Sequence, residues 1–504
     1  MNDARQEATV SLDPAFEVAP VNRRVFGSFV EHMGRCVYGG IYDPGHPHAD
    51  ERGLRADVLE LVRELGVSVV RYPGGNFVSS YRWEDGIGPL AERPRRLNLA
   101  WRCLETNAFG LGEFMDWAAE ADIEPMMTVN LGTRGVAEAC DMLEYCNHPG
   151  GTHLSDLRRK HGAADPYDIK LWCLGNEMDG PWQVGQKTPH EYGRIAAETA
   201  KAMRIIDPSI ELVAAGSSNS GMATFGQWEA TLLENAYDQV DYVSLHHYFD
   251  PDTTDADSFL ASGVVMDRFI SDVVSTCDAI GAKLRRTKRI GLSFDEWNVW
   301  YQSRFTEPGD REWIDSPALI EDDYSVTDAV VVGDLLLTLL RHADRVAIAN
   351  QAQLVNVIAP IRTAGDGPAW RQTVFHPFAL TARLARGVVL RTEPRGPRHD
   401  TDAHGEVPAL STVATRDPET GACVLFAVNR SRQPLDLSVD ARALGDTTLA
   451  EHIVLADSDA SATNSAAEPE RVRPRTITPS GVDGGRCAVR LPAVSWNALR
   501  FNPR

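Results

Sequence analysis

The sequence predicts an α/β protein, a (β/α)8 TIM barrel followed by a smaller C-terminal antiparallel β-sandwich that resembles a jelly roll. Two observations predict the barrel. Up to about residue 385, eight apolar runs of strand length alternate with helical patterns. Most of these runs are continuous, as in parallel strands that are covered on both faces. A third observation predicts the sandwich, because the chain then changes to short strands separated by turn residues.

The barrel is expected to occupy residues 21–384 and the sandwich residues 385–504, with residues 1–20 adding a strand to the sandwich. The length of 504 residues favours two domains, because one hydrophobic core rarely serves so long a chain. The barrel strands are predicted at residues 24–32, 67–75, 124–132, 169–177, 211–218, 241–248, 289–297 and 345–354.

Helices are predicted between these strands, where apolar residues recur at helical spacing. Gly66 is expected to end the first helix, and Thr188 and Ser325 are expected to cap two later ones at their N-termini. In the C-terminal part, the acidic low-complexity segment 456–470 is expected to be a mobile loop. The clearest helical patterns are residues 55–66, 111–123, 188–207 and 325–344.

Charge and composition argue against several classes of protein. The formal net charge of −21 argues against nucleic acid and anionic membranes as partners. No apolar run reaches the roughly 18 residues of a membrane helix, and the first residues, MNDARQEATVSLDP, lack the apolar core of a signal peptide. The 8 cysteines form no C-x-x-C pair, which favours free thiols in a reducing cytoplasm. No histidine pair has the H-x-x-x-H spacing of a zinc site, so no metal is expected.

Two of the predicted barrel strands end in a carboxylate. The stretch LWCLGNEMDG (171–180) brings Glu177 to the end of the fourth strand, and IGLSFDEWNVWY (290–301) brings Glu296 to the end of the seventh. The carboxyl ends of barrel strands meet at one rim, where catalytic groups are found. Two carboxyl groups converging on one pocket are typical of glycoside hydrolysis.

The other strand ends are polar as well, and several tryptophans lie at or just after them. A pocket for a hydroxyl-rich ligand needs such groups, because each sugar hydroxyl both donates and accepts hydrogen bonds. The polar candidates are Glu31, His32, Arg71, Asn76, Asn130, His246, His247, Tyr248, Asn350, Gln351 and Gln353. The tryptophans are Trp83, Trp101, Trp182, Trp297 and Trp300.

Five long motifs resemble glycoside hydrolase family 51, the α-L-arabinofuranosidases. They are FGSFVEHMGRCVYGGIYDP, RYPGGNFVSSYRWEDGIGP, LWCLGNEMDGPWQVG, SLHHYF and DEWNVWY. The resemblance covers nearly the whole chain. It implies an exo-acting, retaining enzyme that releases terminal non-reducing α-L-arabinofuranosyl residues from arabinan, arabinoxylan or derived oligosaccharides. It also implies a cytoplasmic homo-oligomer, often a hexamer, that needs no cofactor.

The resemblance also implies roles for individual residues. Glu177 of GNE would be the acid/base and Glu296 of DEW the nucleophile, with Arg71, His246 and Trp297 supporting them. The chemistry requires Glu177 to be protonated and Glu296 ionised when the substrate arrives. A retaining enzyme holds the two carboxyl groups about 5–5.5 Å apart. The predicted sugar-binding residues are Glu31, Asn76, Asn176, Tyr248, Gln353, Trp101, Trp182 and Trp300.

Three alternatives remain open from the residues alone. The first is the same chemistry on another sugar, as in a β-xylosidase, β-galactosidase or endo-β-glucanase of the same barrel clan. The second is a non-catalytic carbohydrate-binding protein, and the third is a metal-dependent barrel hydrolase. The preferred linkage, the natural oligosaccharide and the oligomeric order also stay open. The segment 302–325 is long enough to shape the outer part of the pocket or to contact a neighbouring subunit.

Overall fold

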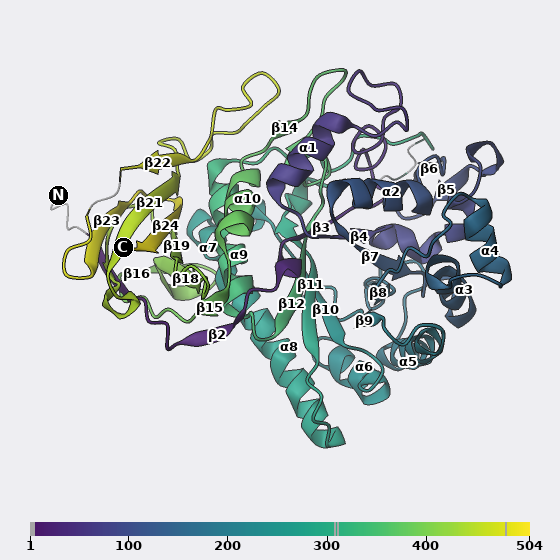
Figure 1. Ribbon diagram of the computed structural model, residues 1–504, viewed down its shortest axis with the longest axis horizontal. Coiled ribbons are helices and arrows are strands. Elements are labelled where there is room, and N and C mark those ends of the chain that lie inside the picture. The colour runs from purple at the N-terminus through teal and green to yellow at the C-terminus, as the bar shows by residue number, and fades with distance from the viewer. Residues whose placement is uncertain (1–5, 307–308, 310–311, 479–480) are drawn as a thin grey trace.

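The computed structural model describes residues 6–306, 309, 312–478 and 481–504. It has two parts, a barrel surrounded by helices and a strand-rich part on the left in Figure 1, with α9 and α10 lying between them. All eight predicted barrel strands are present, and together they form one closed barrel. They are β3 (Gly27–Phe29), β4 (Val69–Tyr72), β7 (Glu124–Val129), β8 (Leu171–Leu174), β9 (Glu211–Ala214), β10 (Tyr242–Phe249), β11 (Gly291–Val299) and β12 (Val346–Ala352).

Each neighbouring pair of barrel strands is parallel, as the continuous apolar runs predicted. Several strands are shorter than the predicted runs, because the polar residues at their carboxyl ends leave the sheet. Near the amino ends of the strands, a cluster of buried side chains fills the interior, so the carboxyl-end rim rests on an apolar floor. That cluster consists of Val69, Met126, Leu171, Cys173, Val213 and Ile348.

The helices begin and end where local signals predict. Thr188 accepts a hydrogen bond from the Glu191 amide, and Ser325 accepts one from the Asp328 amide. Gly66 follows the first helix with a φ of 77°, a conformation that favours glycine. The helices are α1 (Ala56–Leu65), α2 (Leu111–Ala121), α3 (Val136–Asn147), α4 (His153–Lys160), α5 (Pro189–Ile206), α6 (Gln227–Ala236), α7 (Ala256–Leu260), α8 (Ser262–Leu284), α9 (Val326–Arg341) and α10 (Phe375–Leu384).

The strand-rich part consists mainly of a seven-stranded and a three-stranded sheet. The N-terminal strand β1 pairs in parallel with β20 of the smaller sheet, and β2 pairs with β15 of the larger. In order, the larger sheet contains β2 (Glu17–Pro20), β15 (Val388–Leu390), β18 (Leu410–Arg416), β19 (Cys423–Asn429), β24 (Ser495–Pro503), β21 (Thr447–Leu455) and β22 (Arg475–Ile477). The smaller contains β1 (Gln6–Ser11), β20 (Leu435–Asp440) and β23 (Arg486–Leu491).

The remaining strands form three short pairs. The first of them, β5–β6, lies in the connection after β4 and carries Trp101 in its turn. The pairs are β5 (Arg96–Asn98) with β6 (Cys103–Glu105), β13 (Ile361–Arg362) with β14 (Trp370–Arg371), and β16 (Arg398–Thr401) with β17 (Gly405–Pro408).

The barrel and the larger sheet share a continuous core at α9. A Cβ at Gly333 would lie 2.4 Å from the indole of Trp496, so a glycine lets the helix approach the sheet. Beside it, Arg430 donates to Asp334 at 2.6 Å, and both side chains are buried. An ion pair of this kind is strongly destabilising to break, because the remaining charge stays buried. These contacts hold the larger sheet against the barrel at α9.

Segment 456–470 corrects one expectation. Instead of forming a mobile loop, it is held against the start of α9. The Val326 and Thr327 amides donate to the carbonyls of Ala462 and Ala460, both at 3.0 Å. Asn464 is buried, and its side chain accepts from the Val472 amide at 2.7 Å. The first amides of a helix need acceptors outside it, and the low-complexity composition gave no sign that this segment supplies them.

All eight cysteines are free, and seven of them are buried, which confirms the prediction of unpaired thiols. Across the part of the chain that the structure describes, no helix is both long and apolar enough to cross a membrane.

Candidate active site

Glu177 and Glu296 meet at the carboxyl-end rim of the barrel. Glu177 follows β8 through a turn in which Gly175 has a φ of 84° and Glu177 itself a φ of 44°. Glu296 lies within β11. One carboxylate oxygen of each lies within 4.8 Å of the other. The two strand-end carboxylates therefore share one site.

The carboxyl group of Glu177 has one hydrogen-bonding neighbour on each oxygen. The Trp182 indole donates to its Oε2 at 2.7 Å, and the His246 ring lies 3.0 Å from its Oε1. Burial raises the pKa of Glu177, and the neighbouring charge of Glu296 raises it further, although the bonds from His246 and Trp182 oppose both effects. A raised pKa favours the protonated form, which a general acid needs.

The carboxyl group of Glu296 is surrounded by donors. Arg71 donates to Oε1 at 2.6 Å, and the Tyr248 hydroxyl donates to Oε2 at 2.8 Å. Burial and the charge of Glu296 raise the pKa of Tyr248 well above its usual range, so its phenol keeps the proton that it donates. Arg71 also donates to the Asn176 side chain at 2.7 Å. A cation and a hydroxyl on the two oxygens stabilise an ionised carboxylate.

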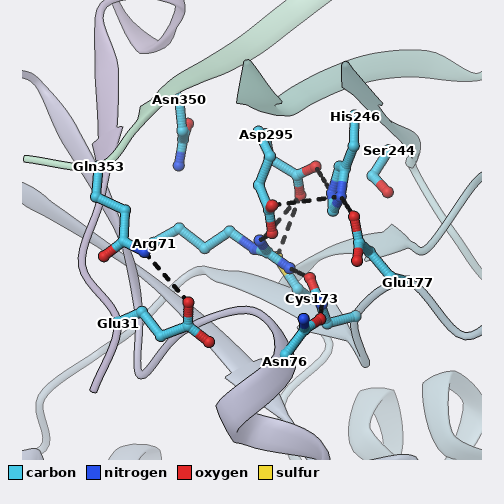
Figure 2. Close-up of polar contacts among 12 residues, drawn as sticks. Glu31, Arg71, Asn76, Cys173, Glu177, Ser244, His246, Asp295, Asn350 and Gln353 are labelled. Carbon is cyan, nitrogen blue, oxygen red and sulfur yellow. Dashed lines mark hydrogen bonds and ion pairs between the residues drawn. The ribbon is translucent and has the colours of Figure 1, made fainter. Parts of the chain in front are cut away.

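His246 connects the two strand ends. Its Nδ1 faces Glu177, and its Nε2 lies 3.0 Å from Asp295 Oδ1 (Figure 2). Burial alone would lower the pKa of His246, but the carboxylates of Glu296, Asp295 and Glu177 outweigh it and raise that pKa to about 10. The ring is therefore an imidazolium that donates to both neighbours. Asp295 had no role in the sequence prediction, although it stands in the DEW motif.

Glu31, Gln353 and Asn76 line the opposite side of the site. Gln353 donates to Glu31 at 3.2 Å, and the Phe77 amide donates to the other oxygen of Glu31 at 2.9 Å. Burial raises the pKa of Glu31 to about 7. The Oε1 atom of Gln353 is buried and has no hydrogen-bond partner among the described residues. This side of the site thus offers a free acceptor next to a carboxyl group that titrates near neutrality.

These groups surround a cavity of about 440 Å³, within the usual size range of small-molecule sites. Most of the predicted sugar-binding residues line it together with both catalytic candidates. Asn176 lies outside this lining, held by Arg71 and donating to Asn76 at 3.3 Å. The predicted residues in the lining are Glu31, Asn76, Trp101, Glu177, Trp182, His247, Tyr248, Glu296, Trp300 and Gln353.

Comparisons with known proteins match nearly the whole chain to α-L-arabinofuranosidases. Residues 61–262 match the α-L-arabinofuranosidase 1 domain, and residues 295–495 match the α-L-arabinofuranosidase C-terminal domain. The intracellular exo-α-(1→5)-L-arabinofuranosidase of Streptomyces lividans is 57% identical over 98% of this chain and 75% of its own. A solved family 51 α-L-arabinofuranosidase from Bifidobacterium longum superposes with a TM-score of 0.95 at 48% identity, covering 99% of this chain and 100% of the other.

This chain belongs to glycoside hydrolase family 51. As a member of that family it is an exo-acting α-L-arabinofuranosidase, as the motifs predicted. Another relative, from Bifidobacterium longum, is named an exo-α-(1→6)-L-arabinofuranosidase and is 53% identical over 98% of this chain and 97% of its own. The alternatives of another glycosidase and of a non-catalytic binding protein are not favoured by these relatives.

Several cavity residues of this family 51 enzyme were missed by sequence reasoning. Ser218 and Asn219 follow β9, so the strand-end rule that selected Glu177 could also have found them. Gln302 was noted only within the segment after β11. The apolar residues of the lining could not be found by a search for polar side chains at strand ends. The missed residues in the lining are Phe29, Met33, Ser218, Asn219, Gln302, Phe305, Ile320 and Ile358.

Eight predicted rim residues do not line the cavity: besides Arg71, His246 and Trp297, they are His32, Trp83, Asn130, Asn350 and Gln351. His32 is buried and bonds Glu105 and Tyr72, at 2.9 and 2.8 Å. Asn130 holds a turn, where its side chain accepts from the Gly132 amide. Trp83 packs against an aromatic ring outside the site. A strand-end position alone could not separate a side chain that faces the ligand from one that anchors its loop.

Trp297 is fully buried, and its indole nitrogen has no hydrogen-bond partner among the described residues. Three other side chains of the site are close enough together to be considered as ligands of a metal ion. Glu177, His246 and Glu296 offer ligand atoms within 4.8 Å of one another. However, a protein group already faces each of these atoms, and the Arg71 cation lies directly on Glu296. This donor set fits a network of hydrogen bonds better than a resident cation.

Proposed function

We propose that the enzyme removes terminal α-L-arabinofuranosyl residues with retention of configuration, using Glu177 as acid/base and Glu296 as nucleophile. The observation that carries the proposal is the close approach of two carboxylates in contrasting environments. Burial favours a proton on Glu177, while Arg71 and Tyr248 donate to both oxygens of Glu296. This contrast is what two carboxyl groups need to act as acid and nucleophile in one site.

In the first step, Glu296 attacks the anomeric carbon while Glu177 gives its proton to the departing oxygen. The bond from that oxygen to the anomeric carbon breaks, and a glycosyl ester with Glu296 forms. Forming the ester removes the negative charge of Glu296, which had helped to keep the proton on Glu177. Glu177 can then remain ionised and take a proton from water, whose oxygen attacks the anomeric carbon and releases Glu296.

Glu31, Asn76 and Gln353 are proposed to hold the sugar ring, and the tryptophans Trp101, Trp182 and Trp300 to contact its apolar faces. Asn176 would bond the 2-hydroxyl, where a hydrogen bond strengthens in the transition state. Its side chain is already oriented by Arg71. The substrates would be oligosaccharides from arabinan or arabinoxylan, with α-(1→5) linkages cleaved best, because the relative from Streptomyces lividans carries that linkage in its name. Comparing kcat/KM on (1→5)- and (1→6)-linked arabinobiose tests the linkage.

Retention is tested directly by the first product. NMR of the anomeric proton during the first minutes of hydrolysis should show the α-anomer, before mutarotation mixes the two forms. The reason is the carboxylate spacing, which is closer to the retaining value of about 5–5.5 Å than to the inverting range of about 6.5–9.5 Å. A β-anomer as first product would rule out the double displacement.

The sugar-holding residues should matter without taking part in proton transfer. Each buried group left unpaired costs about 1–3 kcal/mol. Replacing Glu31, Asn76 or Gln353 by Ala should therefore lower kcat/KM by roughly ten- to a hundredfold, with unchanged thermal unfolding. The exposed glutamine Gln227 on α6 provides a matched control, since Gln227→Ala should be neutral. If all three variants behaved like this control, the sugar would bind elsewhere.

All groups in this mechanism are protein side chains, so no metal or other cofactor is required. Exhaustive dialysis against a chelator should leave kcat/KM unchanged. A loss that only added metal restores would favour a metallohydrolase, with Glu177, His246 and Glu296 as the first ligands to examine.

Two further properties stay predictions. A cytoplasmic location is supported by the word intracellular in the relatives' names. A homo-oligomer, with the hexamer as the expected form, follows from the family resemblance. Light scattering coupled to size-exclusion chromatography measures the oligomeric state.

A further inference from the structure

Five ionisable side chains form a continuous chain that runs from one catalytic glutamate of the cavity to the other. Glu177 faces His246 at 3.0 Å, His246 faces Asp295 at 3.0 Å, Asp295 lies 3.6 Å from Arg71, and Arg71 donates to Glu296 at 2.6 Å. Acidic and basic groups therefore alternate from the acid/base to the nucleophile. Figure 2 shows Asp295 between the Arg71 guanidinium and the His246 ring.

Asp295 is the central member of this chain, and it lies outside the cavity lining. Its side chain is only 1% exposed. Besides the two cations, it accepts from the Cys173 thiol at 3.8 Å, and burial raises the pKa of that thiol to about 12. Asp295 therefore acts on the substrate only through His246 and Arg71.

The local strand geometry explains why Asp295 and Glu296 serve the same site. Consecutive residues of a regular strand point to opposite faces. The pairing of β11 with β12 shifts register between Phe294 and Trp297, and the pairing of β11 with β10 shifts at the same level. Such irregularities redirect side chains next to active sites. Asp295 and Glu296 can thus both reach the Arg71 guanidinium, at 3.6 and 2.6 Å.

The charges of the chain balance in both states of the proposed mechanism. In the free enzyme, Glu177 is protonated, so the cations Arg71 and His246 face the anions Asp295 and Glu296. In the glycosyl-enzyme, Glu296 is esterified and Glu177 is ionised, so the same two cations again face two anions. Without the charge of Asp295, each state would keep one buried cation in excess, which is costly in a poorly solvated site.

We propose that Asp295 is a positioning residue that holds Arg71 on the nucleophile and His246 on the acid/base and supplies the anion that balances them. The proposal rests on the proposed roles of Glu177 and Glu296. It explains how negative charge can pass from Glu296 to Glu177 during catalysis while the two cations remain in place.

The ionisation of His246 provides a test. Titratable groups from three elements face the ring: Glu177 and Asp179 after β8, and Asp295 and Glu296 on β11, with Tyr248 on the same strand as His246. Removing the charge nearest to Nε2 should lower the pKa of His246, since an opposite charge at this distance contributes about one to three units.

The experiment uses the full-length enzyme with ¹³C-labelled histidine, and His246→Gln identifies the signal. In the wild type, the His246 signal should stay that of an imidazolium from about pH 5.5 to 8.5. In Asp295→Asn it should titrate at a clearly lower pH, and kcat/KM should fall at least about tenfold. Glu229→Gln is the matched control, a buried carboxylate on α6 that accepts from the Ser217 amide at 2.8 Å, and it should leave the His246 titration unchanged.

Two results would overturn the proposal. One is an Asp295→Asn enzyme that folds, keeps kcat/KM within about twofold, and keeps a His246 signal that does not titrate. The other needs no variant, which matters if Asp295→Asn does not fold: a wild-type His246 that titrates as an ordinary imidazole between pH 6 and 7.5. Neither readout depends on which glutamate is the nucleophile, so failure of the catalytic assignment would appear separately, in the Glu177 and Glu296 variants.

Discussion

Glu177→Gln should lower kcat/KM on arabino-oligosaccharides by roughly 10²–10⁴-fold, the usual contribution of a general acid. Glutamine keeps the size of the side chain but has a single acceptor oxygen for the two donors Trp182 and His246, so the comparison of leaving groups is what isolates the missing proton. A sugar alkoxide is a strong base and leaves only with that proton, whereas a dinitrophenolate leaves without it. The first chemical step with a dinitrophenyl arabinofuranoside should therefore remain fast. In the wild type, activity on the natural substrate should fall as the pH rises through the pKa of Glu177, which burial raises.

Glu177→Ala extends the test to the second step. With the activated substrate, the glycosyl-enzyme should form and then accumulate, because the base for the attacking water is missing. Azide should enter the vacated space and release the α-linked glycosyl azide, because a substrate that passes through two displacements, one by Glu296 and one by azide, keeps its α configuration. Product NMR identifies the anomer. Equal losses on both substrates, with no azide product, would show that Glu177 is not the acid/base.

Glu296→Ala should abolish activity on both substrates alike, by roughly 10⁴-fold or more, since no covalent intermediate can form without the nucleophile. If azide restores any turnover, the glycosyl azide should have the anomeric configuration opposite to that of the substrate, because it forms in a single displacement. Rapid-quench assays should show no burst of dinitrophenolate. The replacement also leaves Arg71 and Tyr248 without their shared acceptor, so a thermal unfolding curve must accompany the kinetics.

Glu198→Ala is a suitable control for both glutamates. Glu198 lies on α5 in an exposed ion pair with Arg194, and such pairs contribute little to stability. This variant should match the wild type on both substrates. A burst and retained turnover in Glu296→Ala would overturn the assignment of the nucleophile and move attention to Glu31, another buried carboxyl group in the cavity lining.

Much of the fold could be predicted because its signals are local. Eight apolar runs gave eight barrel strands, and the side chains of Thr188 and Ser325 cap the helices that they were expected to cap. The two catalytic candidates could be found because a strand-end carboxylate in a parallel barrel has only one rim to occupy. The rule was less selective for the other polar residues, since it also chose His32 and Asn130, which hold loops in place.

By itself, the sequence determined the barrel, the sandwich and the two glutamates, because apolar periodicity, helix caps and strand-end chemistry are properties of short stretches of chain. Only the tertiary structure decided which side chains meet. Glu31 and Gln353 are 322 positions apart, yet their side chains lie within 3.2 Å, because the barrel closes β12 against β3. Asp295 lies close to both cations because the pairing of β11 with its two neighbouring strands shifts in register. These shifts cannot be predicted from the sequence of β11 alone. Contacts of this kind arise from closure of the sheet and from packing between distant segments.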